Sequence, residues 1–219
     1  MKLNLKRIVV VCGHYGSGKT NLSVNLALLL ARLGKQVTVS DLDIVNPYFR
    51  TADFRELMKE HNIDLVCPQY ANTNLDIPVL PPVLRAALQN EHQTVVVDVG
   101  GDDAGAVALG GYSQLMEQQG YTMLYVINRC RYLTEEVEEE IQLLRAVEAS
   151  SRMKVSYLVN NTNLGPETTA EVVEKSHTYL RKVSAETGIP VLFTSVRKDL
   201  ADGITGDTLP ISIYVKAPW

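Results

Sequence analysis

The sequence predicts an α/β fold, a three-layer α/β/α sandwich with a mostly parallel central sheet, formed by one domain over residues 1–219. Short runs rich in β-branched residues alternate with longer helical patterns along the whole chain, which is typical of right-handed βαβ units. Several runs, such as IVVVC and TVVVDV, are apolar throughout, as expected for strands buried on both faces of a parallel sheet. A hydrophobic fraction of 46% fits an ordinary globular domain.

This alternation defines the elements in order. The strands are expected over residues 7–12, 36–40, 64–66, 94–99, 121–127, 155–159 and 190–194, and the helices over residues 19–33, 52–61, 82–90, 104–119, 135–150 and 167–187. Thr134, followed by Glu135 and Glu136, is typical of an N-cap with acidic residues in the first turn. Gly34 and Gly188 follow helices at positions where a left-handed C-cap residue is expected.

One segment breaks the alternation. Residues 67–82 contain four prolines and show no helical period until their end. Loops of this length are often functional, although some are only surface connections, and both interpretations stay open. If the segment is functional, it is a candidate surface for contact with a partner.

Charge and composition exclude several function classes. Twenty-one Lys and Arg against 25 Asp and Glu give a net charge of −4, which argues against a protein that neutralises nucleic-acid phosphates. No apolar run approaches the ~20 residues that span a bilayer, and the N-terminus lacks the cleavage site of a signal peptide. Cys12, Cys67 and Cys130 show no CxxC spacing, so we interpret them as buried small hydrophobes. We expect a cytoplasmic protein that binds neither nucleic acid nor membrane.

A phosphate-binding motif lies between the first strand and the first helix. Residues 13–20, GHYGSGKT, match the pattern G-x-x-x-x-G-K-[ST]. The glycines let backbone N–H groups converge on phosphate oxygens, and the helix N-terminus adds the positive end of its dipole. By chance the bare pattern arises in about one chain in a hundred of this length, so nucleotide binding is strongly favoured. The residues predicted to bind the nucleotide are Gly13, His14, Tyr15, Gly16, Ser17, Gly18, Lys19, Thr20 and Asn21.

Carboxylates follow two of the predicted strands. Asp98 ends the run VVVD and precedes Gly100 and Gly101, which is typical of a carboxylate that holds Mg²⁺ and of a loop that approaches a γ-phosphate. Asp41 and Asp43 follow another strand, so that one could face the metal and the other an attacking water. A lone Asp is more often a cap or turn residue. Three at the carboxyl edges of strands favour a site, because ligands of such sheets bind at that edge.

The order of motifs resembles a known family. The segments GHYGSGKT (13–20), DLDIVNP (41–47), VVVDVGG (95–101) and YLVNN (157–161) are similar to those of the MinD/ParA/Mrp-type branch of SIMIBI-class P-loop ATPases, which carry the CobQ/CobB/MinD/ParA nucleotide-binding domain. The resemblance covers most of the chain. It implies ATP and Mg²⁺ as ligands, a parallel sheet between helices, and the nucleotide-dependent homodimer that such proteins often form.

The resemblance also implies roles for single residues. It makes Lys19 a phosphate-binding catalytic residue and Asp43 the aspartate that orients the hydrolytic water. It makes Asn160, after a late strand, the asparagine that contacts adenine. The implied metal-site residues are Thr20, Asp41 and Asp98.

The chain departs from the family at one position of the loop. The family carries a lysine that reaches the phosphates of a partner subunit, and this chain has His14 there, followed by Tyr15. A neutral imidazole does not replace a permanent cation, although a protonated one does so in part. Arg50, Arg129 or Arg131 could supply the charge instead, whereas a solvated surface arginine is the commoner role for each.

The base-reading segment favours adenine. Guanine readers commonly use N-K-x-D, and at the matching place this chain has Asn160-Asn161-Thr162-Asn163, in which Asn161 replaces the lysine and Asn163 the aspartate. An amide lacks the charge and the paired acceptors that guanine recognition uses, so ATP is predicted over GTP. The stretch could equally be a simple turn. The segment 195–199, with Arg197, is expected to border the base as well.

These features predict a Mg²⁺-dependent ATPase that acts as a nucleotide-switched regulator or accessory factor for an unidentified protein partner. An alternative is a small-molecule kinase or ligase-like enzyme of the same fold. A second alternative is a nucleotide binder with little turnover, which the change at His14 favours. A DNA- or membrane-binding partition protein and a metal-cluster maturation factor are less favoured, because the chain is acidic and has no CxxC.

Overall fold

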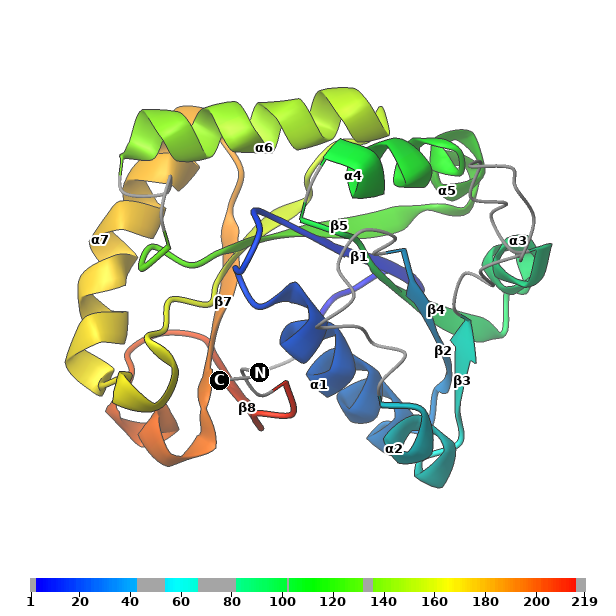
Figure 1. Ribbon diagram of the computed structural model, residues 1–219, viewed down its shortest axis with the longest axis horizontal. Helices are drawn as coiled ribbons and strands as arrows, with labels where there is room; N and C mark the ends of the chain where they lie inside the picture. Colours follow the sequence, from blue (N-terminus) through cyan, green and yellow to red (C-terminus); the bar gives the residue numbers. More distant parts are fainter. Residues whose placement is uncertain (1–2, 43–53, 67–81, 102, 132–135, 216–219) are drawn as a thin grey trace, which may run out of the picture.

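The strands among the described residues form one eight-stranded sheet in the order β3-β2-β4-β1-β5-β6-β7-β8, with all neighbours parallel (Figure 1). The computed structural model describes residues 3–42, 54–66, 82–101, 103–131 and 136–215. Its elements are β1 (Ile8–Cys12), α1 (Lys19–Arg32), β2 (Gln36–Asp41), α2 (Arg55–Glu60), β3 (Ile63–Val66), α3 (Pro82–Gln89), β4 (Gln93–Asp98), α4 (Asp103–Gly110), α5 (Ser113–Gln119), β5 (Tyr121–Ile127), α6 (Val137–Ser151), β6 (Tyr157–Asn160), η2 (Gly165–Glu167), α7 (Ala170–Thr187), β7 (Val191–Arg197), η3 (Lys198–Gly203) and β8 (Thr208–Ile211).

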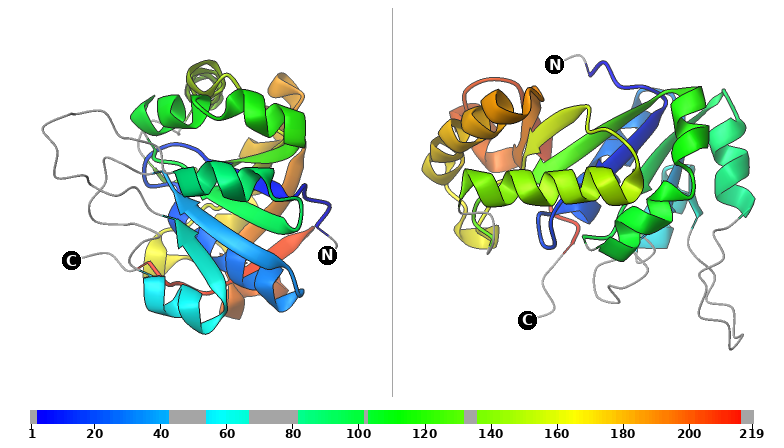
Figure 2. Two further views of the ribbon diagram at one scale, coloured as in Figure 1. Left: turned by 90° about the vertical axis from the view of Figure 1, so that its right-hand side faces the viewer. Right: turned by 90° about the horizontal axis from the view of Figure 1, so that it is seen from above.

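Two apolar layers enclose the sheet, as the predicted three-layer sandwich requires. On one face, Val9 and Val96 pack against α1 and α2, and on the other, Val10 and Val97 pack against α3 to α7. Figure 1 and Figure 2 show α4 and α6 on the opposite side of the sheet from α1 and α2. The strands alternate side chains between these two layers, and both layers are apolar, because a parallel sheet is covered on both faces.

The predicted strands are all present, and their ends shift by a few residues. The sequence analysis missed one strand, β8, which pairs with β7 through partners such as Thr208 and Thr194. β8 contains Pro210, which gives up a ladder hydrogen bond and is tolerated in a strand at the edge of a sheet. A proline and a short length hide such a strand from pattern analysis.

The helix ends also correct the prediction in three places. The expected helix 104–119 is two helices, because Gly110 and Gly111 interrupt it between α4 and α5. Helix α7 begins at Ala170, three residues after the expected start, and the hydroxyl of Thr169 caps it by accepting from the backbone N–H of Val172 at 3.3 Å. Helix α6 begins at Val137, and the predicted cap Thr134 lies outside the described residues.

The predicted C-cap glycines are confirmed. Gly34, which follows the C-cap residue Leu33 of α1, has φ +78°, and Gly188, directly after α7, has φ +73°, so both are left-handed. Within the described part of the chain, no helix is both long enough and apolar enough to cross a membrane.

Candidate functional site

The loop 13–18 joins the end of β1 to the start of α1 in a backbone path that only glycine allows. A Cβ on Gly13 would lie 2.4 Å from the carbonyl oxygen of Val126, which is backbone and does not give way. Gly18 is left-handed, with φ +89°, at the residue before α1. The backbone N–H of Ser17 donates to the carbonyl of His14 at 3.2 Å, which closes the turn. The predicted strand, glycine loop and helix therefore occur together, with the first turn of α1 at the end of the loop.

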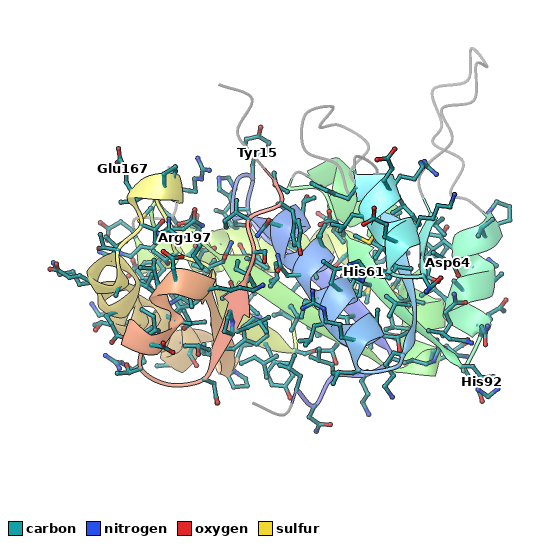
Figure 3. The ribbon with its side chains drawn as sticks, turned by 90° about the horizontal axis from the view of Figure 1, so that it is seen from below. Tyr15, His61, Asp64, His92, Glu167 and Arg197 are labelled. Carbon is teal, nitrogen blue, oxygen red and sulfur yellow. The ribbon has the colours of Figure 1, made fainter. Side chains whose placement is uncertain are left out.

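Lys19 lies against this loop. Its side chain belongs to a residue only 7% exposed, and its Nζ donates to the backbone carbonyl of His14 at 3.0 Å. Thr20, the next residue of the first helical turn, is half-buried. Tyr15 is 56% exposed, and in Figure 3 it stands with Glu167 along the edge where the strands end, whereas His92 marks the opposite edge. The ammonium of Lys19 is thus held at the mouth of the loop.

Two buried carboxylates lie side by side next to α1. Asp41 and Asp98 are the last residues of β2 and β4, they are direct register partners, and each is 1% exposed. Because paired residues of parallel strands point to the same face, both side chains are on the face covered by α1. There the hydroxyl of Ser23 donates to Oδ1 of Asp98 at 3.2 Å. Thr20 lies on α1, as Ser23 does. Its hydroxyl and the two neighbouring carboxylates are oxygen donors of the kind that Mg²⁺ prefers.

The loop after β4 touches the phosphate-binding loop. A Cβ on Gly101 would lie 2.7 Å from Nζ of Lys19, 2.7 Å from Cα of Tyr15 and 2.9 Å from its backbone nitrogen. Only a glycine permits this close approach. The structure therefore brings the segment after Asp98 to the phosphate-binding loop. The predicted approach to a γ-phosphate stays a prediction, and Asp43 lies outside the described residues.

Asn160 is buried, and hydrogen bonds hold its side chain between neighbouring elements. The residue is 0% exposed, and its Nδ2 donates to Oγ of Ser176 at 2.8 Å and to Oγ1 of Thr194 at 3.4 Å. Its Oδ1 accepts from the backbone N–H of Thr162 at 3.1 Å. The side chain thus links β6 to α7 and β7, and its contact with adenine stays a prediction.

The neighbouring Asn161 is the residue that reaches the loop, and the sequence analysis missed this role. Its Nδ2 donates to the backbone carbonyl of Ser17 at 2.7 Å, and its Oδ1 accepts from Oγ of Ser195 at 2.8 Å. A Cβ on Gly18 would lie 2.2 Å from this Nδ2, so the amide packs directly on the loop. The run of asparagines at the end of β6 indicates that one of them contacts the loop. Which one does so depends on the direction in which each side chain points.

We expect Asn161→Ala to destabilise the protein by about 1–3 kcal/mol, because it leaves the Ser17 carbonyl and the Ser195 hydroxyl without this partner in a buried place. Urea unfolding measures the effect. Asn163→Ala is the matched control, since the Asn163 amide bonds only within its own turn, to Asn161 and Gly165. Equal stability of the Asn161→Ala variant and the wild type would contradict the role given to this amide.

Two further predicted nucleotide-binding residues serve other contacts. Oδ1 of Asn21 accepts from the backbone N–H of Tyr214 at 2.8 Å, and its Nδ2 donates to the carbonyl of Ser212 at 3.1 Å, because one step along a helix turns the side chain by about 100° away from the loop. Arg197 donates to both oxygens of Asp199 at 2.7 Å. The Arg197 guanidinium also holds the pKa of the Asp199 carboxyl below its ordinary value. The predicted roles of Asn21 and Arg197 in nucleotide binding stay predictions, and these are the contacts of their side chains in the structure.

The described cysteines differ in their surroundings. Cys12, the last residue of β1, is 1% exposed, and burial raises the pKa of its thiol to about 12, so it behaves as the predicted buried hydrophobe. Cys130 is exposed, which corrects the same prediction for that residue. Cys67 lies outside the described residues.

Comparison with known families gives one match over most of the chain. The family model described as the CobQ/CobB/MinD/ParA nucleotide binding domain matches residues 8–202. A comparison with curated proteins found no match.

Solved structures share the fold at low sequence identity. Signal Recognition Particle 54 kDa protein from Aeropyrum pernix K1 in complex with GDP has a TM-score of 0.58 at 18% identity, and the match covers 89% of this chain and 42% of that one. FtsY from Mycoplasma mycoides has a TM-score of 0.59 at 21% identity, with 90% and 62% covered. Chloroplast FtsY from Physcomitrella patens has a TM-score of 0.60 at 15% identity, with 92% and 62% covered. The chain therefore spans about half of these proteins, and the likeness shows the fold alone.

Proposed function

Because the chain belongs to the CobQ/CobB/MinD/ParA nucleotide-binding domain family, we propose that it is a Mg²⁺-dependent ATPase that acts as a nucleotide-switched factor for a protein partner. Nucleotide binding follows from the family. The Mg²⁺-dependent ATPase activity is proposed from the placement of Lys19, whose ammonium lies against the loop. Ser23, on the same helix, donates to the buried carboxylate of Asp98, and Asp98 is the register partner of Asp41. This site combines a cation for phosphates with oxygen ligands for a metal.

The donor set supports Mg²⁺ as the metal. Asp41 and Asp98 supply carboxylates, and Thr20 supplies a hydroxyl in the first turn of α1. When bound, Mg²⁺ would neutralise part of the charge on the phosphates. Ser23 holds the carboxylate of Asp98 in place by donating to its Oδ1. Lys19 adds a positive charge from the side of the loop.

The residues around the asparagine run support adenine over guanine. Nδ2 of Asn163 donates to the carbonyl of Asn161 at 2.7 Å, and its Oδ1 accepts from the backbone N–H of Gly165 at 3.2 Å. The amide is thus committed to its own turn, at the position where guanine readers carry a carboxylate. Guanine nucleotides are the competing ligands, because the Aeropyrum pernix structure of similar fold contains GDP.

Hydrolysis and switching complete the proposal. Water attacks the γ-phosphate, the bond to the β-phosphate oxygen breaks, and ADP and phosphate leave; the family pattern assigns Asp43 to orient the water. The loop at Gly101 lies against Lys19 and Tyr15, so it responds to the presence of the γ-phosphate. Residues 67–82, of which 67–81 lie outside the described residues, are the candidate contact surface for the partner. ATP consumption only after addition of a metabolite would instead identify a small-molecule kinase, and tight binding without turnover would identify a nucleotide binder.

We expect the purified chain to bind ATP more tightly than GTP, with affinity that rises when Mg²⁺ is added, and to release phosphate from ATP. In Asp98→Asn the rise with Mg²⁺ is expected to disappear, because the neutral amide is a poor metal ligand, while the fold persists. Titration calorimetry with and without Mg²⁺ measures this.

Ser23→Ala is the matched control for that variant, since it removes the hydrogen bond to Asp98 but keeps the carboxylate. An unchanged Mg²⁺ response in Asp98→Asn would argue against the metal site. Preference for GTP would overturn the assignment of the base. Size-exclusion profiles with ADP and with a non-hydrolysable ATP analogue report whether a homodimer forms on the nucleotide.

A further inference from the structure

The turn that follows β5 returns to the phosphate-binding loop and places an arginine on it. Nε of Arg131 donates to the backbone carbonyl of Gly16 at 2.9 Å. A Cβ on Gly16 would lie 3.1 Å from this Nε and 3.3 Å from Cζ, so the guanidinium packs directly on the glycine. Gly16 is left-handed, with φ +75°. The contact is therefore with a left-handed glycine of the predicted phosphate-binding loop.

Buried hydrogen bonds fix the turn that carries Arg131. Asn128 is 1% exposed, and its Oδ1 accepts from the backbone N–H of Cys130 and of Asn163, both at 3.1 Å. The backbone N–H of Arg131 donates to the carbonyl of Asn128 at 3.1 Å. The turn is thus braced against the segment after β6, and the position of Arg131 over the loop is built into the fold.

The other arginine of this turn points elsewhere. The guanidinium of Arg129 lies 5.4 Å from the centre of the Tyr179 ring, on α7, in a cation–π contact. Arg129 and Arg131 thus differ by two positions in sequence, carry the same charge, and serve different surfaces. This difference supplies a matched pair for experiment.

The charge at this place has a chemical use. A nucleoside triphosphate brings several negative charges to the loop, and Lys19 is the one permanently charged cation among residues 13–20. Arginine keeps its charge at all physiological pH values and is well suited to phosphate. Because Arg131 comes from the same chain as the loop, its charge is present without a partner subunit.

We propose that Arg131 is a residue of the nucleotide site, which supplies in cis the second positive charge facing the phosphates and holds the loop through the Gly16 carbonyl. This inference rests on the proposed nucleotide binding at the loop. It makes Arg131 a residue that helps the site to distinguish ATP from ADP and adenosine monophosphate. A charge role requires that the contribution of Arg131 grows from adenosine monophosphate to ADP to ATP and falls as salt rises.

The test compares Arg131→Gln, Arg131→Lys and Arg129→Gln with the wild type by titration calorimetry with AMP, ADP and ATP at two salt concentrations. Arg131→Gln is expected to weaken ATP binding about tenfold, as for one charge-assisted contact at a partly exposed position, and ADP binding less. Arg131→Lys is expected to recover part of the loss, and Arg129→Gln to bind as the wild type does.

Other outcomes overturn the inference. Wild-type ATP affinity in Arg131→Gln, or an equal loss for AMP, ADP and ATP, rejects a charge role at the phosphates. An equal loss in Arg129→Gln shows only a general effect of surface charge and rejects it too. Failure of the wild type to bind any nucleotide is a different result, because it rejects the nucleotide site itself. Thermal unfolding of each variant separates a loss of binding from a loss of fold.

Discussion

Replacing Lys19 by alanine is expected to weaken ATP binding by roughly 10²- to 10⁴-fold while the domain stays folded. The side chain is the cation of the loop, with Nζ 3.0 Å from the carbonyl of His14 and close to Gly101. Two charge-assisted hydrogen bonds to phosphates, each worth about 1.5–3 kcal/mol, account for a loss of that size. Titration of the purified variant with ATP in the presence of Mg²⁺ measures it.

The control for this variant is Lys35→Ala, which removes the same charge beyond the far end of α1, where the side chain is exposed. That variant is expected to bind ATP as the wild type does. If Lys19→Ala keeps the affinity of the wild type, or if Lys35→Ala loses as much, then the loop is not where the phosphates bind. Circular dichroism and thermal unfolding check that both variants are folded.

The sequence predicted the architecture because its strongest signals are local. Apolar runs such as residues 8–11 and 95–97 are buried on both faces, and their hydrophobic pattern alone identifies them as inner strands of a parallel sheet. The edge strand β8 has a weaker signal, because it contains Pro210 and pairs on one side only among the described residues. Helix ends at Gly110 and Thr169 depend on packing and capping that pattern analysis locates only within a few residues.

The candidate site was predicted where chemistry and spacing coincide within one segment. The segment after Asp98 approaches the loop 13–20 at Gly101, and the motif and the strand end each fix their own backbone. The choice between Asn160 and Asn161 was out of reach, because it depends on which side chain faces the loop across 144 residues of sequence. The same holds for Asn21, whose helical position turns it toward the segment after β8.

A buried acid on α6 is expected to make the stability of the protein depend on pH. Glu140 is 0% exposed, and neither carboxylate oxygen has a hydrogen-bond partner within normal distance among the described residues. Burial raises its pKa from 4.5 to about 7, and the nearby hydroxyls of Tyr125 and Tyr179 offset that rise only in part. Tyr125 lies on β5, where it is the register partner of Cys12 on β1.

The raised pKa means that the folded state binds the proton of Glu140 more tightly than the unfolded state does. The resulting stability is complete below pH 4.5 and is lost as the pH rises through about 7. The shift corresponds to about 3 kcal/mol, since one pKa unit is about 1.4 kcal/mol. Glu140→Gln keeps the shape and has no proton to lose. We therefore expect urea unfolding at pH 8 to show a free energy of unfolding that is higher in the variant than in the wild type, by up to about 3 kcal/mol.

At pH 5 the two proteins should differ much less, because Glu140 is then protonated in the folded wild type. Glu139→Gln is the control, since Glu139 is its exposed neighbour on the same helical turn, and that change is expected to leave the pH profile as it was. The difference between wild type and variant at each pH cancels the contribution of the other acids. A gap between Glu140→Gln and the wild type that is the same at pH 5 and pH 8 would mean that this carboxyl ionises in the folded protein as easily as in the unfolded chain, so that water or a movement of α6 reaches it.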